Sequence, residues 1–264
     1  MKSAADDISI LDLSANAYAS LHLAVVCPMA NEAETAERFV LDVLSNCRQY
    51  PFATVTFHAV LDKASRDGTL DLLRNLARTV PELNVIYAPE NANVVDAYRR
   101  GYAEAWGRGA DWILEIDAGY SHRPDQISRL LDRIPDGIDC VFSTRFARGG
   151  TYEGGLSRRY LVSRIGGWLA RMLLGVRGTD LTSGFQLFSR TSMQRILDHG
   201  LRSQGAFFQT EIKTYLRGMR SAEVPITYRP TAQAVRPSAI QDALLVLLLM
   251  FVQRLLPRAL SRPE

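Results

Sequence analysis

The stretch Trp112-Ile-Leu-Glu-Ile-Asp-Ala-Gly-Tyr-Ser-His-Arg-Pro124 decides how this chain folds. It begins as an apolar strand and ends in acidic residues, which a sharp turn follows. Glu115 and Asp117 are two positions apart, so both carboxylates project from one face of a strand. Asp117 stands at the carboxyl end of that strand, where open α/β sheets bind their ligands. Pro124 suits the first turn of a helix, which we expect over Asp125–Arg133.

Apolar, β-branched runs alternate with helical patterns on both sides of this stretch. We expect strands at Leu21–Pro28, Thr54–Asp62, Asn84–Ala88, Ile113–Asp117, Asp139–Arg145, Phe185–Ser189 and Ala222–Tyr228. We expect the other helices at Asn31–Asn46, Asp67–Thr79, Val94–Gly107, Ser157–Leu174, Phe208–Arg217 and Ser238–Leu256. Continuous apolar strands separated by helices predict an α/β fold, with a mostly parallel central sheet flanked by helices. No Gly-x-Gly-x-x-Gly follows the first strand, which disfavours a dinucleotide-binding fold.

The charge of the chain is small in total but uneven along the sequence. The net charge is +3 over 264 residues, which argues against a general nucleic-acid-binding protein. Between Arg145 and Arg177, however, the sequence has seven arginines, no lysine and a single acidic residue, Glu153. This local basic field fits an anionic ligand or an anionic membrane surface, and a solvated basic face gives the same pattern.

Cysteine usage and hydropathy indicate the compartment. The three cysteines are Cys27, Cys47 and Cys140. They are far apart and form no Cys-x-x-Cys, which predicts reduced thiols without a disulfide framework or a zinc site. Acidic residues interrupt the N-terminal segment, so we expect no signal peptide. The longest apolar run, Ala243–Val252, has ten residues, and a membrane-spanning helix needs about 20.

Several segments carry chemically informative residues in a fixed order. They are Val26-Cys-Pro-Met-Ala-Asn-Glu32, Leu61-Asp-Lys-Ala-Ser-Arg-Asp-Gly-Thr69, Glu115–Pro124, Ser143-Thr-Arg-Phe146 with Ser157-Arg-Arg-Tyr-Leu-Val-Ser163, Thr179–Phe188, Phe208–Glu211 and Val224–Tyr228. Together they resemble the polyprenyl-phosphate branch of the family-2 glycosyltransferases, the branch of dolichyl-phosphate mannose synthase. The resemblance implies a GT-A-type nucleotide-sugar-binding fold. It also implies inverting transfer of a sugar from a nucleotide sugar to a polyprenyl phosphate.

The resemblance also implies a role for each matching residue. On the donor side, it implies nucleotide or sugar contacts for Pro28, Glu32, Asp62, Asp117, Asp180, Gln209, Glu211 and Arg229, with Arg236 as the alternative to Arg229 at the diphosphate. Asp117 would also bind a Mg²⁺ or Mn²⁺ ion. On the acceptor side, it implies that Arg145, Arg159 and Ser163 hold the lipid phosphate, with Asp117 completing the catalytic set. Arg159 and Ser163 are four positions apart, so they share one helix face.

Three positions depart from the pattern of the family. Lys63 stands in place of an aspartate, Gln186 in place of an arginine, and Gly119 in place of the second, metal-binding aspartate. Because these departures fall near the expected donor site, two alternatives stay open. The chain could use an acceptor that is not a lipid, or it could bind nucleotide sugars without turnover. His122 fits a phosphate contact and a purely structural turn equally well.

The expected organisation has three parts. Residues 1–19 form a lead-in, residues 20–237 the GT-A domain, and residues 238–264 a C-terminal apolar helix. That helix fits a membrane interface, and it also fits packing on the sheet or on a partner. The lipid acceptor requires a membrane, and the reduced cysteines without an expected signal peptide favour the cytoplasm. Together they predict a cytoplasmic protein attached peripherally to the inner face of a membrane. Its expected partners are a nucleotide sugar and a polyprenyl phosphate, without nucleic acid.

Overall fold

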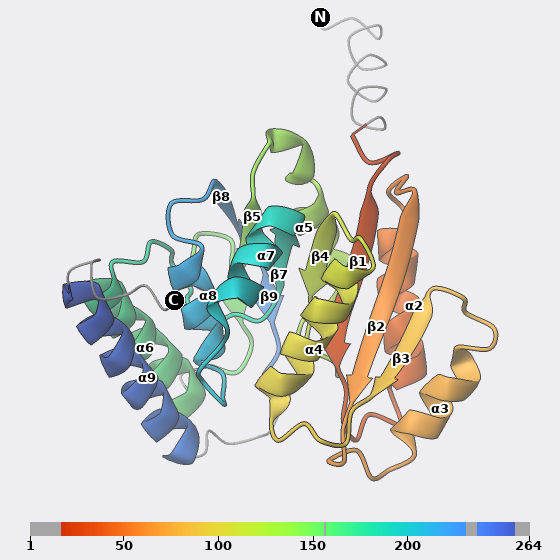
Figure 1. Cartoon of the computed structure of the whole chain (residues 1–264), viewed down its shortest axis with the longest axis horizontal. Helices are drawn as coiled ribbons and strands as arrows, with labels where there is room; N and C mark the ends of the chain where they lie inside the picture. The colour runs from red at the N-terminus through yellow and green to blue at the C-terminus, as the bar shows by residue number, and fades with distance from the viewer. Residues whose placement is uncertain (1–16, 156, 231–236, 257–264) are drawn as a thin grey trace, which may run out of the picture.

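The computed structural model describes residues 17–155, 157–230 and 237–256. Within them, one sheet has the strand order β3-β2-β1-β4-β7-β5-β8 (Figure 1). Its strands are β1 His22–Pro28, β2 Thr54–Leu61, β3 Leu83–Tyr87, β4 Trp112–Glu115, β5 Cys140–Thr144, β7 Gln186–Ser189 and β8 Ser221–Pro225. β7 runs antiparallel to its neighbours β4 and β5, and the other pairs are parallel. The prediction of an α/β fold with a mostly parallel sheet is therefore confirmed.

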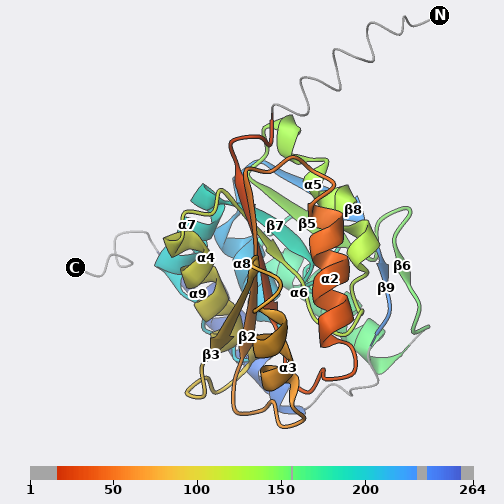
Figure 2. The ribbon, with the colours of Figure 1, turned by 90° about the vertical axis from the view of Figure 1, so that its right-hand side faces the viewer.

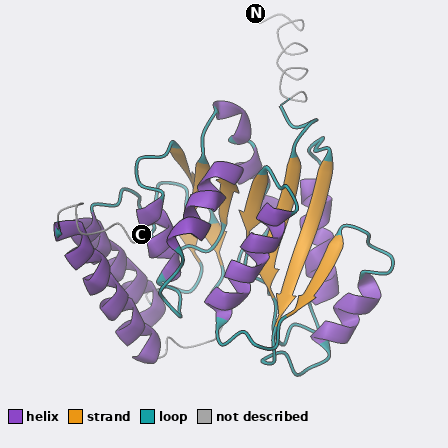
Figure 3. Ribbon diagram, viewed as in Figure 1, coloured by secondary structure: helices purple, strands orange, loops and turns teal. Residues whose placement is uncertain are grey.

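Helices cover both faces of this sheet (Figures 1 and 3). They are α2 Ala36–Cys47, α3 Thr69–Leu76, α4 Val94–Gly107, α5 Ser128–Leu131, α6 Arg158–Leu174, α7 Arg190–His199, α8 Phe208–Tyr215 and α9 Pro237–Leu255. Two 3-10 turns, η1 Pro124–Gln126 and η2 Ile134–Asp136, flank α5. A second, small parallel sheet pairs β6 Thr151–Tyr152 with β9 Thr227–Tyr228.

Strand β1 shows how the sheet divides the apolar side chains between two cores. Leu23, Val25 and Cys27 belong to the core on one face, while Ala24 and Val26 belong to the core on the other. Helices α2 and α5 lie on the first face, and α4, α7 and α8 lie on the second (Figure 2). This alternation follows from the two-residue period of a strand. All five side chains are fully buried, which explains why the strand reads as a continuous apolar run.

Some element boundaries differ from the sequence-based expectation. Helix α2 begins at Ala36, so the prediction that it opens at Asn31 is wrong; Asn31 has a φ of 59° and belongs to a loop. The helix expected over Asp125–Arg133 is reduced to η1 and the four-residue α5. The strand expected over Ala222–Tyr228 is broken into β8 and β9, because the chain leaves the main sheet to pair with β6. Helix α7 was not predicted.

Helices α6 and α9 pack against each other at the β8 end of the sheet (Figure 1). A small separate core joins them, built around Ala170, Leu174 and Val246. The α9 helix has 19 residues with a mean hydropathy of 1.6, long and apolar enough in length and composition to cross a membrane. The ten-residue apolar run underestimated the length of the apolar helix, because further apolar residues alternate with polar ones at both of its ends. The three-part division of the chain stays a prediction, and the predictions for residues 1–16, for Arg236 and for residues 257–264 lie outside the described residues.

Candidate active site

The carboxyl ends of β1, β2 and β4 lie side by side at one edge of the sheet. The chain passes from β1 to β2 and β3 on one side and then to β4 on the other, so the strand order switches direction between β1 and β4. Such a switch point is where open α/β sheets bind ligands. Glu32, Asp62 and Asp117 follow the three strand ends, so the structure brings these predicted donor-site residues to the same edge. Pro28 is the last residue of β1 and is half-buried.

The loops after β1 and β2 are tied together by side chain to backbone hydrogen bonds. The Asn31 side chain donates to the carbonyl of Ala64 and accepts from the backbone N–H of Arg66, both at 2.9 Å. The backbone N–H of Glu32 donates to the Thr69 hydroxyl at 2.8 Å. These bonds explain the positive φ of Asn31, since asparagine tolerates that region better than most residues. Asn31 therefore braces two loops of the site instead of opening α2.

The Asp117 side chain is 43% exposed and is held from one side. The buried Tyr98 on α4 donates its hydroxyl to Asp117 Oδ1. Burial and then the negative charge of Asp117 raise the pKa of Tyr98 well above its ordinary value, so the phenol keeps its proton and donates it. Asp117 is thus oriented at the strand end while its carboxylate stays reachable from solvent.

His122 lies behind Asp117 in an aromatic surrounding. Its Nδ1 is 3.5 Å from Asp117 Oδ2, and its ring packs against Phe185 and Tyr228 with centroid distances of 5.5 and 5.0 Å. Burial lowers the pKa of His122 to about 4, so the ring is neutral at physiological pH. In the described part of the chain neither ring nitrogen has a hydrogen-bond partner.

Gly119 allows the turn after Asp117 to approach the loop after β1. Its φ is +75°, and a Cβ at this position would lie 3.1 and 3.2 Å from the two carboxylate oxygens of Glu32. Thr35 donates its hydroxyl to Glu32 Oε2 at 2.9 Å and fixes the orientation of that carboxylate. The space that a side chain at position 119 would enter is therefore bordered by Glu32.

A fully buried polar cluster lies beneath the site, around Glu115. Its carboxylate accepts hydrogen bonds from the Tyr102 hydroxyl and from the side-chain amides of Gln209 and Gln186. Burial raises the pKa of Glu115 to about 7, although the bonds from Tyr102 and Gln209 lower it in part. Gln209, predicted to contact the sugar, is thus committed to this cluster. Gly184 makes room for it, because a Cβ there would lie 2.9 Å from Gln209 Nε2.

Arg145 and Asp180 form a buried, bidentate ion pair. Arg145 Nε is 2.6 Å from Asp180 Oδ2, Nη2 is 2.8 Å from Oδ1, and the two side chains are 3% and 0% exposed. The guanidinium stacks between the rings of Phe146 and Tyr228, each 5.0 Å away. Burial alone would raise the pKa of Asp180, but the charge of Arg145 outweighs it and the pKa is lowered. This geometry favours a positioning role for both residues over direct contact with phosphate or sugar.

Glu211 and Arg229 are also engaged with other parts of the protein. Glu211 is buried on α8, where it accepts from the backbone N–H groups of Arg202 and Ser203 at 2.8–3.2 Å. It therefore holds the loop before α8. Arg229 is largely exposed and pairs with Glu153 at 2.8 Å. Because exposed ion pairs are weak, an anionic ligand could replace Glu153 as the partner of Arg229.

Arg159 and Ser163 lie on successive turns of α6, and both are half-buried. The Arg159 guanidinium carbon is 5.9 Å from the centroid of the Tyr228 ring. Since Tyr228 also packs on His122, a continuous row of contacts links Arg159 to Asp117. The structure therefore connects Arg159 of the predicted acceptor side to Asp117 of the predicted donor side, and Ser163 lies one turn further along the same helix.

Sequence reasoning missed Tyr98, Tyr102 and the buried Lys213. The two tyrosines are four positions apart on α4, and that spacing places them on one helix face. This was the available signal, but their partners Glu115 and Asp117 come from another element. Lys213 donates to the carbonyl of Ser183 at 3.2 Å, and burial lowers its pKa to about 8. Nothing in the local sequence indicates its burial.

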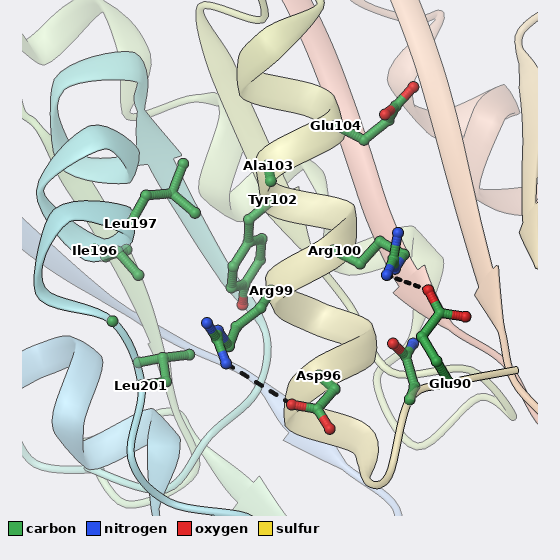
Figure 4. A pocket seen from close by; sticks show the side chains of 12 residues that line it. Glu90, Asp96, Arg99, Arg100, Tyr102, Ala103, Glu104, Ile196, Leu197 and Leu201 are labelled. Carbon is green, nitrogen blue, oxygen red and sulfur yellow. Dashed lines mark hydrogen bonds and ion pairs between the residues drawn. The ribbon is translucent and has the colours of Figure 1, made fainter. Parts of the chain in front are cut away.

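A cavity of about 580 Å³ lies elsewhere, between α4 and α7 (Figure 4). Its charged side chains are paired: Arg100 with Glu90, Arg99 with Asp96 at 3.8 Å, and Glu104 with Arg108 outside the lining. None of the predicted site residues lines it. The candidate site is therefore the edge at the strand ends and not this cavity.

The residues at that edge fit a divalent cation with few protein ligands. In the described residues no group of three or more His, Cys, Asp or Glu side chains converges on a metal position. Glu32 nevertheless offers its carboxylate oxygens beside the Gly119 turn, and the Asp117 carboxylate at the start of that turn is 43% exposed. Mg²⁺ needs only one or two carboxylates when phosphate oxygens and water complete its shell. A nucleoside diphosphate would supply those phosphate oxygens.

Comparison with known proteins agrees with this geometry. Residues 24–197 match the glycosyl transferase family 2 domain. A polyprenol monophosphomannose synthase of Mycolicibacterium smegmatis is 32% identical over 207 residues, which cover 77% of this chain and 76% of that protein. An undecaprenyl-phosphate mannosyltransferase of Micrococcus luteus is 32% identical over 171 residues, covering 64% and 70% of the two chains.

Solved structures share the fold at lower identity. A glucosyl-3-phosphoglycerate synthase from Mycobacterium tuberculosis, solved with Mn²⁺, UDP-glucose and phosphoglyceric acid, superposes with a TM-score of 0.62 at 19% identity, over 92% of this chain and 84% of that one. A mannosyl-3-phosphoglycerate synthase from Rubrobacter xylanophilus gives 0.64 at 18% identity, over 92% and 79%. These structures show a GT-A-like fold, and the family match with the two 32% identical relatives shows a glycosyltransferase. The chain belongs to glycosyl transferase family 2.

Proposed function

We propose that this chain transfers a sugar from a nucleotide sugar to a polyprenyl phosphate, with inversion at the anomeric carbon. Two relatives at 32% identity carry names that describe mannosyl transfer to such lipids, which supports the proposal. The observation that carries it is the double character of α6. One end bears Arg159 and Ser163 beside the donor edge, and one face bears exposed apolar side chains.

The apolar face of α6 suits the tail of a lipid acceptor. Leu161, Ile165, Trp168 and Met172 are each 49–62% exposed and recur with helical spacing, so they form one stripe. An acceptor with a charged head and a long apolar tail matches a helix that offers a guanidinium and a hydroxyl next to such a stripe. A small polar acceptor would leave the stripe unused.

The donor side can be assigned from the strand ends. Pro28, Glu32 and Asp62 would line the nucleoside, with Asp117 beside the diphosphate and Arg229 reaching it by exchanging its partner Glu153. The remaining predicted residues would position other groups rather than touch the donor. Asp180 and Arg145 would hold each other, Gln209 would hold Glu115, and Glu211 would hold the loop before α8. A divalent cation, Mg²⁺ or Mn²⁺, bound at Asp117 would neutralise the leaving diphosphate.

The chemistry needs no general base. The acceptor phosphate is already anionic at neutral pH, so its oxygen attacks the anomeric carbon directly. The bond from that carbon to the diphosphate breaks as the new bond forms, and the electron pair leaves with the diphosphate. Attack from the face opposite the leaving group inverts the anomeric carbon. Arg159 and Ser163 would hold the attacking phosphate in line, so positioning supplies much of the rate enhancement.

The same helices support a peripheral membrane location. On α9, Leu244, Leu245, Leu248 and Leu255 are 54–67% exposed, and α9 lies beside α6. Two adjacent helices with exposed apolar faces and nearby arginines fit the interfacial zone of an anionic bilayer. We propose a cytoplasmic protein that meets its lipid substrate at the inner face of the membrane.

The test is transfer from a panel of nucleotide sugars to undecaprenyl phosphate in mixed micelles, with 3-phosphoglycerate as a water-soluble acceptor in a parallel arm. We expect a lipid-linked sugar. Arg159→Ala should raise the KM for the lipid by about tenfold or more, because a charge-assisted hydrogen bond contributes about 1.5–3 kcal/mol. The adjacent, exposed Arg158→Ala is the matched control and should change little. Transfer to phosphoglycerate alone, or hydrolysis without a lipid product, would refute the proposal.

A further inference from the structure

Two carboxylate residues lie at the switch point, each following the end of one of two neighbouring strands. In the parallel pairing of β1 with β4, Val26 is opposite Glu115. Asp117 thus leaves β4 level with the end of β1, and the loop that follows β1 carries Glu32. The closeness of Glu32 to the turn after Asp117 is measured by Gly119, whose missing Cβ would lie 3.1 Å from Glu32 Oε1.

Gly119 leaves a space that only one carboxylate can use. A side chain at this position would meet both oxygens of Glu32 at 3.1–3.2 Å, on a backbone with φ of +75° that side chains rarely adopt. An aspartate there would also bring two negative charges together at close range. The glycine therefore allows Glu32 to reach the turn, and the carboxylate beside the turn comes from the β1 loop.

Neither carboxylate has a cationic partner in the part of the chain that the structure describes. The ion pairs found there include no lysine or arginine for Glu32 or for Asp117. Behind Asp117, beside the Tyr98 hydroxyl that donates to it, lies His122, which is 1% exposed and has no hydrogen-bond partner among the described residues, with Nδ1 3.5 Å from Asp117 Oδ2. A diphosphate would add further negative charge at this edge, and a cation is needed to compensate it.

We infer that Glu32 is the second protein ligand of the divalent cation, acting with Asp117 across the Gly119 turn. The inference rests on the proposed function for the nature of the bound nucleotide, and it replaces the nucleotide contact predicted for Glu32 with a metal contact. The cation joins the two carboxylates to the diphosphate, so metal and nucleotide bind cooperatively. By linkage, each tightens the other by the same factor.

The experiment measures Mn²⁺ binding by water-proton relaxation in the full chain, with and without GDP or UDP, and without any sugar transfer. The native protein should bind Mn²⁺ much more tightly in the presence of nucleotide. Glu32→Gln keeps the size of the side chain and an acceptor for Thr35. It should weaken Mn²⁺ binding by at least about tenfold, since even outer partners of metal ligands change affinity by 10–100-fold. The exposed Glu34→Gln on the same loop is the matched control and should bind like the native protein.

A second variant moves the carboxylate to the other side of the gap. In Glu32→Ala/Gly119→Asp, the removal of Glu32 frees the space, and aspartate tolerates positive φ better than most residues. This double variant should recover part of the Mn²⁺ affinity that Glu32→Ala loses. Gly119→Asp alone should bind no tighter than the native protein, since its side chain meets Glu32.

Each outcome separates this inference from the proposed function. Unchanged Mn²⁺ affinity in Glu32→Gln, or no binding by the native protein with either nucleotide, overturns the inference even if lipid transfer is observed. Loss of Mn²⁺ binding in Glu32→Gln without any lipid transfer by the native protein supports the metal ligand and refutes the acceptor assignment. Equal loss in Glu34→Gln would mean that loop charge, not ligation, sets the affinity, and would also overturn it.

Discussion

Removing Asp180 should destabilise the fold strongly, because it leaves the Arg145 guanidinium buried without a counter-charge. The pair is bidentate, with contacts of 2.6 and 2.8 Å, and both side chains are almost completely buried. Breaking such a pair from one side typically costs about 3–5 kcal/mol. In a chain of this size about 1 kcal/mol corresponds to about 2–4 °C in Tm. Asp180→Ala should therefore lower the Tm by roughly 6–20 °C.

The design includes a double variant that removes both charges. Arg145→Met/Asp180→Leu replaces the pair with apolar side chains of similar volume, which is often neutral for stability. It should recover most of the loss, as measured by urea unfolding followed by circular dichroism. Its KM for the lipid acceptor should stay within about threefold of the native value if Arg145 is a positioning residue. A folded double variant with no lipid transfer would show instead that Arg145 contacts the phosphate.

The buried pair contributes little if Asp180→Ala lowers the free energy of unfolding by less than about 1 kcal/mol while its slope with urea concentration stays unchanged. That result would mean that water or a neighbouring group reaches the guanidinium, and that the pair is not isolated from solvent. A double variant as unstable as the single one would show that packing, and not the unpaired charge, dominates the loss.

Three further predictions concern stability and membrane contact. Burial lowers the pKa of His58 to about 4. The stability that the neutral ring contributes is therefore complete above the unfolded pKa of about 6.5 and is lost as the pH falls toward 4. Between pH 7 and pH 4 the free energy of unfolding, measured by urea titration, should fall by about 2–3 kcal/mol more in the native protein than in His58→Gln. Asn93 accepts hydrogen bonds from the backbone N–H groups at the start of α4, so Asn93→Ala should cost about 1 kcal/mol, and an unchanged urea midpoint would contradict the cap. Trp168→Ala should reduce binding to anionic vesicles about fivefold or more in sedimentation assays. Tyr87 is exposed on the distant β3, so Tyr87→Ala should leave vesicle binding unchanged. Equal losses in the two variants would argue against contact between α6 and the membrane.

Local patterns predicted the sheet because each strand carries its own signal. The continuous apolar run of β1 and the acidic end of β4 depend on residues close in sequence, and so the edge that holds Asp117 could be foreseen. The start of α2 could not, because the conformation of Asn31 is set by hydrogen bonds to Ala64 and Arg66 more than 30 positions away.

The predicted site residues also divide into those placed by nearby sequence and those whose role depends on partners far away in the chain. Asp117 could be placed from its strand end, and the spacing of Arg159 and Ser163 put both on one helix face. That the two groups belong to one site was implied only by the family resemblance. The commitment of Asp180 to Arg145, and of Gln209 to Glu115, depends on partners 35 and 94 positions apart. Each of these side chains carries the chemistry of a ligand contact and of an internal support equally well. Only the packed structure separates the two uses.

The separate core between α6 and α9 has a consequence for how the molecule opens. It is much smaller than the two cores that cover the sheet, and only 17% of the α9 apolar window is buried. A unit with so little buried surface has a lower free energy of local unfolding than the sheet, so its amide protons exchange sooner. We therefore expect the helix pair to open in hydrogen exchange before the sheet does, while the strands that carry Asp117 stay closed.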